Sequence, residues 1–238
     1  LKKKQKTNIK FKNIKWEKDI TKLSKLPSIF LANEFFDAIP IKQFLKNKNY
    51  WYERFIKISG KKKLSFTKKK INIKTLEKKL NFKISDKQKF IEYSPLGLKY
   101  LKDILKVIKK NKGGLLIIDY GYFAKRMRNT LQAIHNKNYS NVLDNIGKSD
   151  ITYNINFYLI DKIANNFNKL DINYTSQGKF LNNLGIYQRA EIISKNKTFS
   201  EKVDIFYRLK RLIDENEMGK LFKVMLIKSS NDNSIIGF

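Results

Sequence analysis

The strongest constraint on the fold comes from two short runs of consecutive apolar residues, each of which ends in acidic side chains. The first run covers Ser28 to Ala32 and the second covers Leu115 to Ile118. Runs of this length without polar alternation are typical of strands buried on both faces of a parallel sheet. Between them, apolar residues from Leu96 to Ile108 recur at helical spacing, and a glycine pair follows. Buried strands that alternate with helices predict an α/β protein.

The remaining sequence predicts further strands and helices around this unit. A turn-rich segment separates two strand-like stretches, which predicts a hairpin, and a third, edge strand follows it. The second half of the chain is expected to contain an amphipathic helix, a second helical stretch and a closing strand. The expected strands are 41–45, 51–58, 64–66 and 221–227, and the expected helices are 157–167 and 180–184.

Composition excludes several classes of functional site. The chain has 238 residues, no cysteine and one histidine. Without cysteine, disulfides, thiolate zinc sites and cysteine nucleophiles are excluded, and a single histidine excludes a multi-histidine metal site. The longest uncharged apolar run, residues 113–118, is too short to span a bilayer.

The net charge of +30 has two interpretations. Lysine outnumbers arginine by 45 to 6, although arginine is the residue preferred for bidentate phosphate and guanine contacts. Asparagine and isoleucine are also abundant, so genome composition explains much of the lysine excess, and a selected polyanion site is the alternative. The lysines cluster, with twelve in residues 61–90. In either case we expect weak, non-specific binding of nucleic acid at low salt, and if the lysines are compositional this binding is lost as salt rises.

The candidate functional residues follow the two apolar runs. Asn33, Glu34 and Asp37 come directly after the first run, and Asp119 follows the second. In open α/β sheets, ligands bind at the carboxyl ends of the strands. Two carboxylates there can hold a cation or a guanidinium, or accept a proton from an attacking amine. The alternative is that these residues cap the next element or stabilise a turn.

Two other titratable residues have ordinary explanations in the sequence. His135 lies between an apolar and a polar residue, so a surface position is favoured over catalysis. Glu92 precedes a Ser-Pro pair and is expected to be an acid at a helix start. The ten glycines never occur with one residue between them, and no Walker pattern is present, so the sequence contains no phosphate-binding loop.

The first block also resembles a known family. Leu31 to Pro40, LANEFFDAIP, closely resembles the "ANEFFDALP" block of the MidA-like family of class I S-adenosylmethionine-dependent methyltransferases. Further blocks that resemble the family follow in family order, and together they cover about residues 27–228. Departures include Asn156, where the family usually has Asp, and Gln132-Ala133 in place of Arg-Gly. The further blocks are 51–54, 91–95, 114–121, 130–135, 150–157, 176–186 and 218–224.

The resemblance implies a particular fold and domain organisation. It implies a Rossmann-like methyltransferase sheet that contains the fourth to seventh strands, with residues 41–90 as a lysine-rich β-hairpin insertion. The family's Gly-rich cofactor turn and its acidic ribose-binding residue belong before the block at Asn33. We therefore expect residues 1–238 to be the C-terminal part of a single methyltransferase domain that lacks the N-terminal cofactor-binding strands.

The resemblance also implies a function. Mitochondrial members of the family are protein-arginine methyltransferases needed for assembly of respiratory complex I, so a protein substrate from a respiratory complex and the cofactor S-adenosylmethionine are implied. Glu34, Asp37 and Asn33 would be catalytic, Ala32 and Asn33 would contact the cofactor, and Asp119, His135 and Glu92 would contact the substrate.

The partners, the activity of the isolated chain and its location are further expectations, and two other functions remain as alternatives. A missing N-terminal segment or its gene product is an expected partner, and a homodimer is possible. Alone, the chain is expected to be inactive. The expected location is the cytoplasm in a bacterium or the mitochondrial matrix in a eukaryote. A non-catalytic assembly or binding protein and a basic nucleic-acid-binding protein are the alternative functions.

Overall fold

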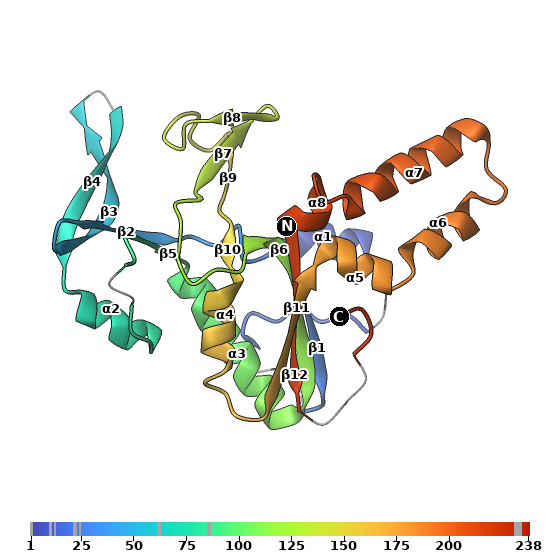
Figure 1. Cartoon of the computed structure of the whole chain (residues 1–238), viewed down its shortest axis with the longest axis horizontal. Helices are drawn as coiled ribbons and strands as arrows, with labels where there is room; N and C mark the ends of the chain where they lie inside the picture. The colour runs from blue at the N-terminus through green and yellow to red at the C-terminus, as the bar shows by residue number, and fades with distance from the viewer. Residues whose placement is uncertain are drawn as a thin grey trace.

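The centre of the molecule is a mixed five-stranded sheet (Figure 1). The computed structural model describes residues 2–9, 11, 13–20, 23, 25–60, 63–84, 87–230 and 235–238. The strand order is β1-β6-β12-β11, with β10 paired to the end of β6. β1 and β10 run parallel to β6, and β12 runs antiparallel to it. The prediction of an α/β protein is confirmed. The strands are β1 (Ser28–Asn33), β6 (Gly113–Tyr122), β10 (Ile155–Asn156), β11 (Leu170–Ser176) and β12 (Phe222–Ser229).

Two helices, α3 (Pro95–Asn111) and α4 (Phe157–Ala164), pack on one face of this sheet. Ser94 caps the first turn of α3 by accepting a hydrogen bond from the Gly97 backbone N–H. Both helices were predicted, although α4 ends three residues earlier than expected. The closing strand and the helix near residue 180 are confirmed as β12 and α5 (Gln177–Asn183). The core between helices and sheet includes Leu101, Leu105, Ile108, Leu115, Ile117, Ile163, Met225 and Ile227.

The expectation that the first apolar run forms a strand buried on both faces is wrong. The run forms β1, but Ile29 is 88% exposed and Leu31 is 69% exposed, whereas Ala32 is buried. β1 lies at the end of the sheet and pairs only with β6 among the described residues. Helix α3 contacts one face of β1. The run is therefore apolar on both faces although the described chain covers only one of them.

A second, antiparallel sheet has the strand order β4-β3-β2-β5. It confirms the predicted hairpin and the predicted edge strand, which is longer than expected. β5 was not predicted, and neither was the helix α2. The interpretation of residues 41–90 as an insertion stays a prediction. Residues 61, 62, 85 and 86 of this region lie outside the described residues. The elements are β2 (Lys42–Asn47), β3 (Tyr50–Ser59), β4 (Lys63–Ile71), α2 (Ile73–Leu80) and β5 (Phe90–Tyr93).

Apart from the N-terminal helix, the remaining elements form a small sheet and, in residues 186–213, a helical arm with a short helix at its base (Figure 1). The small sheet has the order β8-β7-β9. The capping box of α7, in which Thr198 and Glu201 bond each other's backbone N–H groups, was a readable signal for this unpredicted helix. None of the described helices is both long and apolar enough to cross a membrane. These elements are α1 (Lys2–Asn8), β7 (Gln132–His135), β8 (Asn138–Ser140), β9 (Asp150–Thr152), α6 (Ile186–Ser194), α7 (Phe199–Ile213) and α8 (Met218–Leu221).

Candidate active site at the carboxyl ends of β1 and β6

The parallel pairing of β1 with β6 brings the two predicted acidic segments to one edge of the sheet. Asn33 is in register with Ile118, so Glu34 and Asp119 both follow directly after the paired residues. The Glu34 backbone N–H donates to the Ile118 carbonyl at 2.9 Å. Glu34 then turns the chain with φ of 44°, a left-handed conformation that is uncommon outside glycine. Such a backbone is found often at functional sites, where the surrounding structure holds it in place.

Asp119 holds the turn after β1 in place. Its side chain is completely buried. Oδ2 accepts hydrogen bonds from the backbone N–H of Phe36 at 3.0 Å and of Asp37 at 3.4 Å, and Oδ1 accepts one from Tyr120 at 2.9 Å. Both carboxylate oxygens are thus engaged by backbone donors. These contacts agree with the alternative that Asp119 stabilises a turn. We infer that Asp119 positions residues 34–37.

Asp37 is the buried carboxylate with a free oxygen. It is 5% exposed, and Oδ1 is the one buried side-chain polar atom without a hydrogen-bond partner among the described residues. Buried polar atoms are nearly always paired, so an unpaired carboxylate oxygen calls for an explanation. Burial, and then the nearby charge of Glu34, raise the pKa of Asp37. A cationic ligand that donates to Oδ1 would remove this unfavourable burial.

The pKa of Asp119 is raised as well, to about 7. Burial is the main cause and the neighbouring Asp37 is the second, whereas the backbone N–H donors oppose the shift. Two carboxylates that compete in this way favour a state in which one of them carries a proton. The site therefore suits a positively charged guest, whose binding would allow both groups to ionise.

Glu92 lies in a different part of the site and is built into a hydrogen-bond network. It belongs to β5 and is 3% exposed, so the expectation of an acid at a helix start is wrong. The Gln43 amide donates to its Oε2 at 2.5 Å, and both the backbone N–H and the hydroxyl of Thr130 donate to Oε1. Arg54 donates to the Oε1 of Gln43 at 3.0 Å. Burial raises the pKa of Glu92, and this network connects the second sheet to the loop after β6.

A small cavity of about 30 Å³ lies between Glu92 and the turn after β1. Glu92, Phe36, Tyr153 and Asn156 are among its lining residues. Its volume is sufficient for a water molecule. The pKa of Tyr153 is raised mainly by burial, and then by the charges of Asp119, Glu92 and Asp37. Sequence reasoning missed Tyr153, Gln43 and Arg54, because only their position in the fold relates them to the acids.

The other predicted site residues are more dispersed. Ala32 is buried and Asn33 is exposed at the end of β1, beside Glu34. His135 lies in β7 of the small sheet, with Nδ1 at 3.1 Å from the Lys148 carbonyl oxygen. The described structure gives no contact between His135 and the carboxylates at the end of β1. No group of three His, Cys, Asp or Glu residues in the described parts of the chain could hold a metal ion.

Comparison with known proteins gives one family. Residues 1–175 match the family model described as "Putative S-adenosyl-L-methionine-dependent methyltransferase". Among curated proteins, the chain is similar to the mitochondrial protein arginine methyltransferase NDUFAF7 of Danio rerio, with 26% identity over 88% of this chain and 49% of that protein. It is 28% identical to the Caenorhabditis elegans homologue of that protein over 74% of this chain and 42% of that one. The chain thus spans about half the length of the curated relatives it matches.

Solved structures show the same fold. A Burkholderia thailandensis protein in complex with S-adenosyl-homocysteine superimposes with a TM-score of 0.77. The two sequences are 22% identical, and the match covers 93% of this chain and 58% of that one. A second crystal structure from the same organism has the same TM-score, with 23% identity over 91% of this chain and 59% of the other.

Proposed function

The chain belongs to this family of S-adenosyl-L-methionine-dependent methyltransferases, and from this premise we propose that it forms the methyl-acceptor side of a protein-arginine methyltransferase. The names of the relatives support arginine as the methylated residue. The acceptor protein that the sequence resemblance implies is a subunit of a respiratory complex, and it too belongs to the proposal.

One observation carries the assignment of the acceptor site. Asp37 has a buried, unpaired oxygen, and the exposed Glu34 lies three residues before it at the same edge of the sheet. A guanidinium has donors on several sides and remains charged at every physiological pH. It can satisfy Oδ1 of Asp37 and pair with Glu34 at the same time. Its charge would also allow Asp37 and Asp119 to ionise together.

The chemistry assigned to these residues is the positioning and deprotonation of a nitrogen nucleophile. S-adenosyl-L-methionine, when bound, supplies a methyl group on a sulfonium sulfur. Asp37 and Glu34 hold the guanidinium so that one nitrogen faces that methyl group, which turns a bimolecular encounter into an oriented one. As the nitrogen forms its bond to the methyl carbon and the carbon–sulfur bond breaks, the nitrogen loses a proton, and Glu34 is the exposed carboxylate placed to accept it.

The residues at the end of β1 fit one end of this cofactor. The ammonium group of its methionine part is a cation, and Ala32 and Asn33 offer backbone and side-chain acceptors at the carboxyl end of a parallel strand. None of the ten glycines has the spacing of a phosphate- or nucleotide-binding turn. We infer that binding of the adenosine part depends on further polypeptide, which would pair along the open edge of β1.

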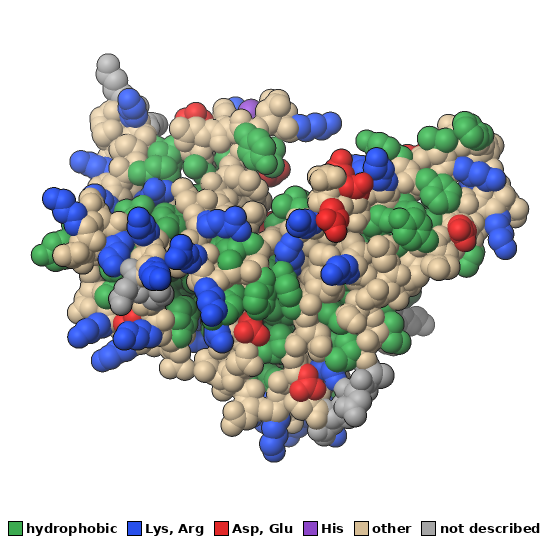
Figure 2. Space-filling view, in the orientation of Figure 1, with side chains coloured by type: hydrophobic (Ala, Val, Ile, Leu, Met, Phe, Trp, Pro, Cys, Tyr) green, Lys and Arg blue, Asp and Glu red, His purple; other side chains and the backbone are tan. Residues whose placement is uncertain are grey.

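The alternatives are a non-catalytic assembly protein and a basic nucleic-acid-binding protein. The buried free carboxylate oxygen favours the enzyme, because an assembly surface or a nucleic-acid surface gives no reason to bury an unpaired negative group. The lysines cover much of the second sheet (Figure 2), and composition explains their excess over arginine without a selected site.

The test is methyl transfer by the complete enzyme, in which this chain is joined or mixed with the polypeptide that corresponds to the rest of the relatives. Transfer of labelled methyl groups to arginine in a protein acceptor is measured for the parent and for Glu34→Gln. Loss of one charge-assisted pair costs about 1.5–3 kcal/mol, so the rate should fall roughly 10- to 100-fold with little change in cofactor affinity.

The control is Glu191→Gln, which makes the same change at an exposed glutamate of α6 and should leave the rate unchanged. A parent enzyme that transfers no methyl group to any arginine would overturn the proposed function. An active parent with an unaffected Glu34→Gln variant would overturn only the role given to Glu34.

A further inference from the structure

Two of the six arginines of the chain lie in one short loop. This loop covers residues 123–131, connects β6 to β7 and contains Lys125, Arg126 and Arg128 but no acidic residue. The composition that explains the lysine excess works against arginine, since lysine outnumbers it by 45 to 6. Composition therefore does not account for these two arginines, and arginine is the residue that binds carboxylates through two parallel N–H groups.

Buried polar side chains hold this loop in place from three other parts of the chain. Gln88, 5% exposed, accepts from the backbone N–H of Met127 at 3.3 Å and donates to its carbonyl at 3.1 Å. Asn156 donates to a carbonyl near the start of the loop at 3.0 Å, and Glu92 accepts from a backbone N–H near its end at 3.1 Å. In Figure 1 the loop accordingly passes between β5 and β10. Its shape is thus fixed before any ligand binds, which lowers the entropic cost of binding.

The two arginine side chains of the loop are exposed. Cζ of Arg128 lies 4.4 Å from the centroid of the Tyr122 ring, a cation–π contact that steadies the guanidinium and leaves its in-plane N–H groups for a ligand. Within the described parts of the chain, neither Arg126 nor Arg128 forms an ion pair, whereas Arg208 on α7 pairs with Asp204. The loop therefore presents two guanidinium groups whose charge the described chain does not neutralise.

The loop also lies close to the proposed acceptor site. Glu92 and Asn156, which hold the loop, line the cavity of about 30 Å³ together with Phe36. Phe36 belongs to the turn after β1, between Glu34 and Asp37. A polypeptide whose arginine reaches Glu34 and Asp37 would therefore place the residues that flank this arginine beside the loop.

We propose that the loop 123–131 binds carboxylate side chains that flank the target arginine in the acceptor protein. The acidic site then takes the arginine and the basic loop takes its acidic neighbours, so that complementary charges set the orientation of the acceptor. This inference rests on the proposed function. The carboxylate of the cofactor is the other anion at the site, but two exposed arginines on a surface loop suit a macromolecule better than one small ligand.

The test uses the complete enzyme and two acceptor peptides, one with a single arginine between glutamates and one with glutamines in place of the glutamates. Arg126→Ala with Arg128→Ala should raise KM for the glutamate peptide roughly tenfold and change kcat little, because two exposed charge-assisted pairs are lost. The KM values for the glutamine peptide and for the cofactor should not change. Arg126→Lys with Arg128→Lys keeps both charges without the paired donors and should restore only part of the loss.

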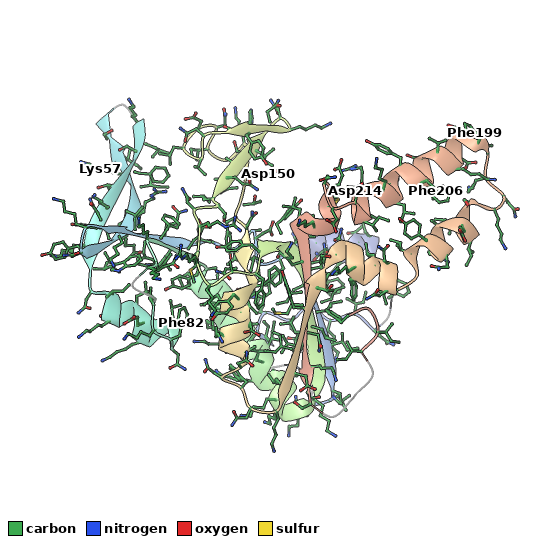
Figure 3. The ribbon with its side chains drawn as sticks, in the orientation of Figure 1. Lys57, Phe82, Asp150, Phe199, Phe206 and Asp214 are labelled. Carbon is green, nitrogen blue, oxygen red and sulfur yellow. The ribbon has the colours of Figure 1, made fainter. Side chains whose placement is uncertain are left out.

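The matched control is Arg189→Ala with Arg211→Ala, which removes two exposed arginines from the arm. Arg211 lies between Phe206 and Asp214, and Figure 3 shows both of these on the far side of the central sheet from the loop. This control should leave every KM unchanged. An equal rise in both double variants would assign the effect to the general attraction of a chain with a net charge of +30 and would overturn the proposal.

Three other outcomes are decisive. A parent enzyme without preference for the glutamate peptide, or a loop variant that raises KM for the cofactor instead, would overturn the role of the loop. A parent enzyme that transfers no methyl group would overturn the proposed function. In that case the loop is judged by fluorescence anisotropy of the labelled glutamate peptide with residues 1–238, where the loop variant should weaken binding and the control should not.

Discussion

At the scale of single residues, the site depends on two neighbouring carboxylates with different surroundings. Asp119 is engaged by three backbone N–H groups, whereas Asp37 keeps one buried oxygen without a partner. Burial raises the pKa of both groups, and a neighbouring charge adds to it: Glu34 for Asp37, and Asp37 for Asp119. The pair is thus unfavourable in the empty protein and is relieved by a cation.

This pair predicts a pH dependence of stability. The pKa of Asp119 is about 7 in the folded protein, above its ordinary value of 3.8, so the folded state holds a proton that the unfolded state has lost. The contribution of this group therefore lowers the free energy of unfolding as pH rises from about 4 to about 7. Asp37→Asn removes the neighbouring charge, lowers the pKa of Asp119 and should flatten this dependence. Urea unfolding of both proteins between pH 5 and pH 8 measures the difference, and parallel curves would contradict the account.

Asn156 gives a second prediction at this scale. Its side-chain oxygen accepts from the Leu159 N–H at 3.2 Å and its amide donates to the Ala124 carbonyl at 3.0 Å, in a residue that is 5% exposed. Aspartate, the residue usual in the family, can cap α4 but cannot donate to that carbonyl. Asn156→Asp should therefore lower the free energy of unfolding by about 1–3 kcal/mol.

The control for this change is Asn165→Asp. Asn165 also donates from its amide to a backbone carbonyl, that of Asp161, but in an exposed position where water can replace the bond. Asn165→Asp should therefore change the free energy of unfolding much less than Asn156→Asp does. Equal effects of the two substitutions would show that burial at Asn156 is unimportant.

Sequence reasoning located the candidate residues better than it defined their roles. Glu34 and Asp37 were placed after a strand end correctly, because an apolar run followed by acids is a local signal. Asp119, expected after the second strand, lies inside β6, three residues before its end. The network of Glu92 was not foreseen, since Gln43 and Thr130 lie 49 and 38 positions away from it in the chain. Such contacts come from tertiary packing, which local spacing does not encode.

At the scale of elements, local periodicity correctly predicted where helices and strands lie. It did not predict which of their faces are covered by the rest of the protein. The helix α3, the strand β6 and the β2–β3 hairpin lie where the pattern placed them. The run that became β1 has the composition of a fully buried strand, yet Ile29 and Leu31 are exposed. Whether a neighbouring element covers a strand depends on the rest of the protein, and the composition of the strand indicates only that it is suited to being covered.

The open edge of β1 therefore predicts self-association of the chain through this face. Exposed apolar edge strands are sites of aggregation. Ile29→Ser with Leu31→Ser should reduce light scattering on concentration, with little loss of stability, because both side chains are already in water. Ile56→Ser with Ile58→Ser is the control, since these residues are 57% and 70% exposed on β3. Equal scattering by the parent and the β1 variant would contradict the prediction.

At the scale of the whole molecule, the positions of the glycines indicate that the described elements do not provide a Gly-rich nucleotide-binding turn. Gly121 lies at the carboxyl end of β6, but a Cβ there would meet the Ile155 carbonyl and the Phe157 ring, so its role is close packing inside the protein. Gly178 and Gly219 fit the base of the arm in the same way. The carboxyl end of β1 continues through Glu34 and Phe35 without a glycine. High-affinity nucleotide binding in such sheets uses a Gly-rich turn and a helix N-terminus, and the described elements offer neither together.

The most direct test of the central claim is calorimetric titration of S-adenosyl-L-methionine into purified residues 1–238. We propose that this chain forms the acceptor side of the site and that only the methionine end of the cofactor contacts it, at Ala32 and Asn33. This proposal is the central claim. It therefore predicts a dissociation constant of about a millimolar or weaker, with no methyl transfer by the chain alone. Micromolar binding would contradict it, because the cofactor site would then lie among residues to which the account gives structural roles.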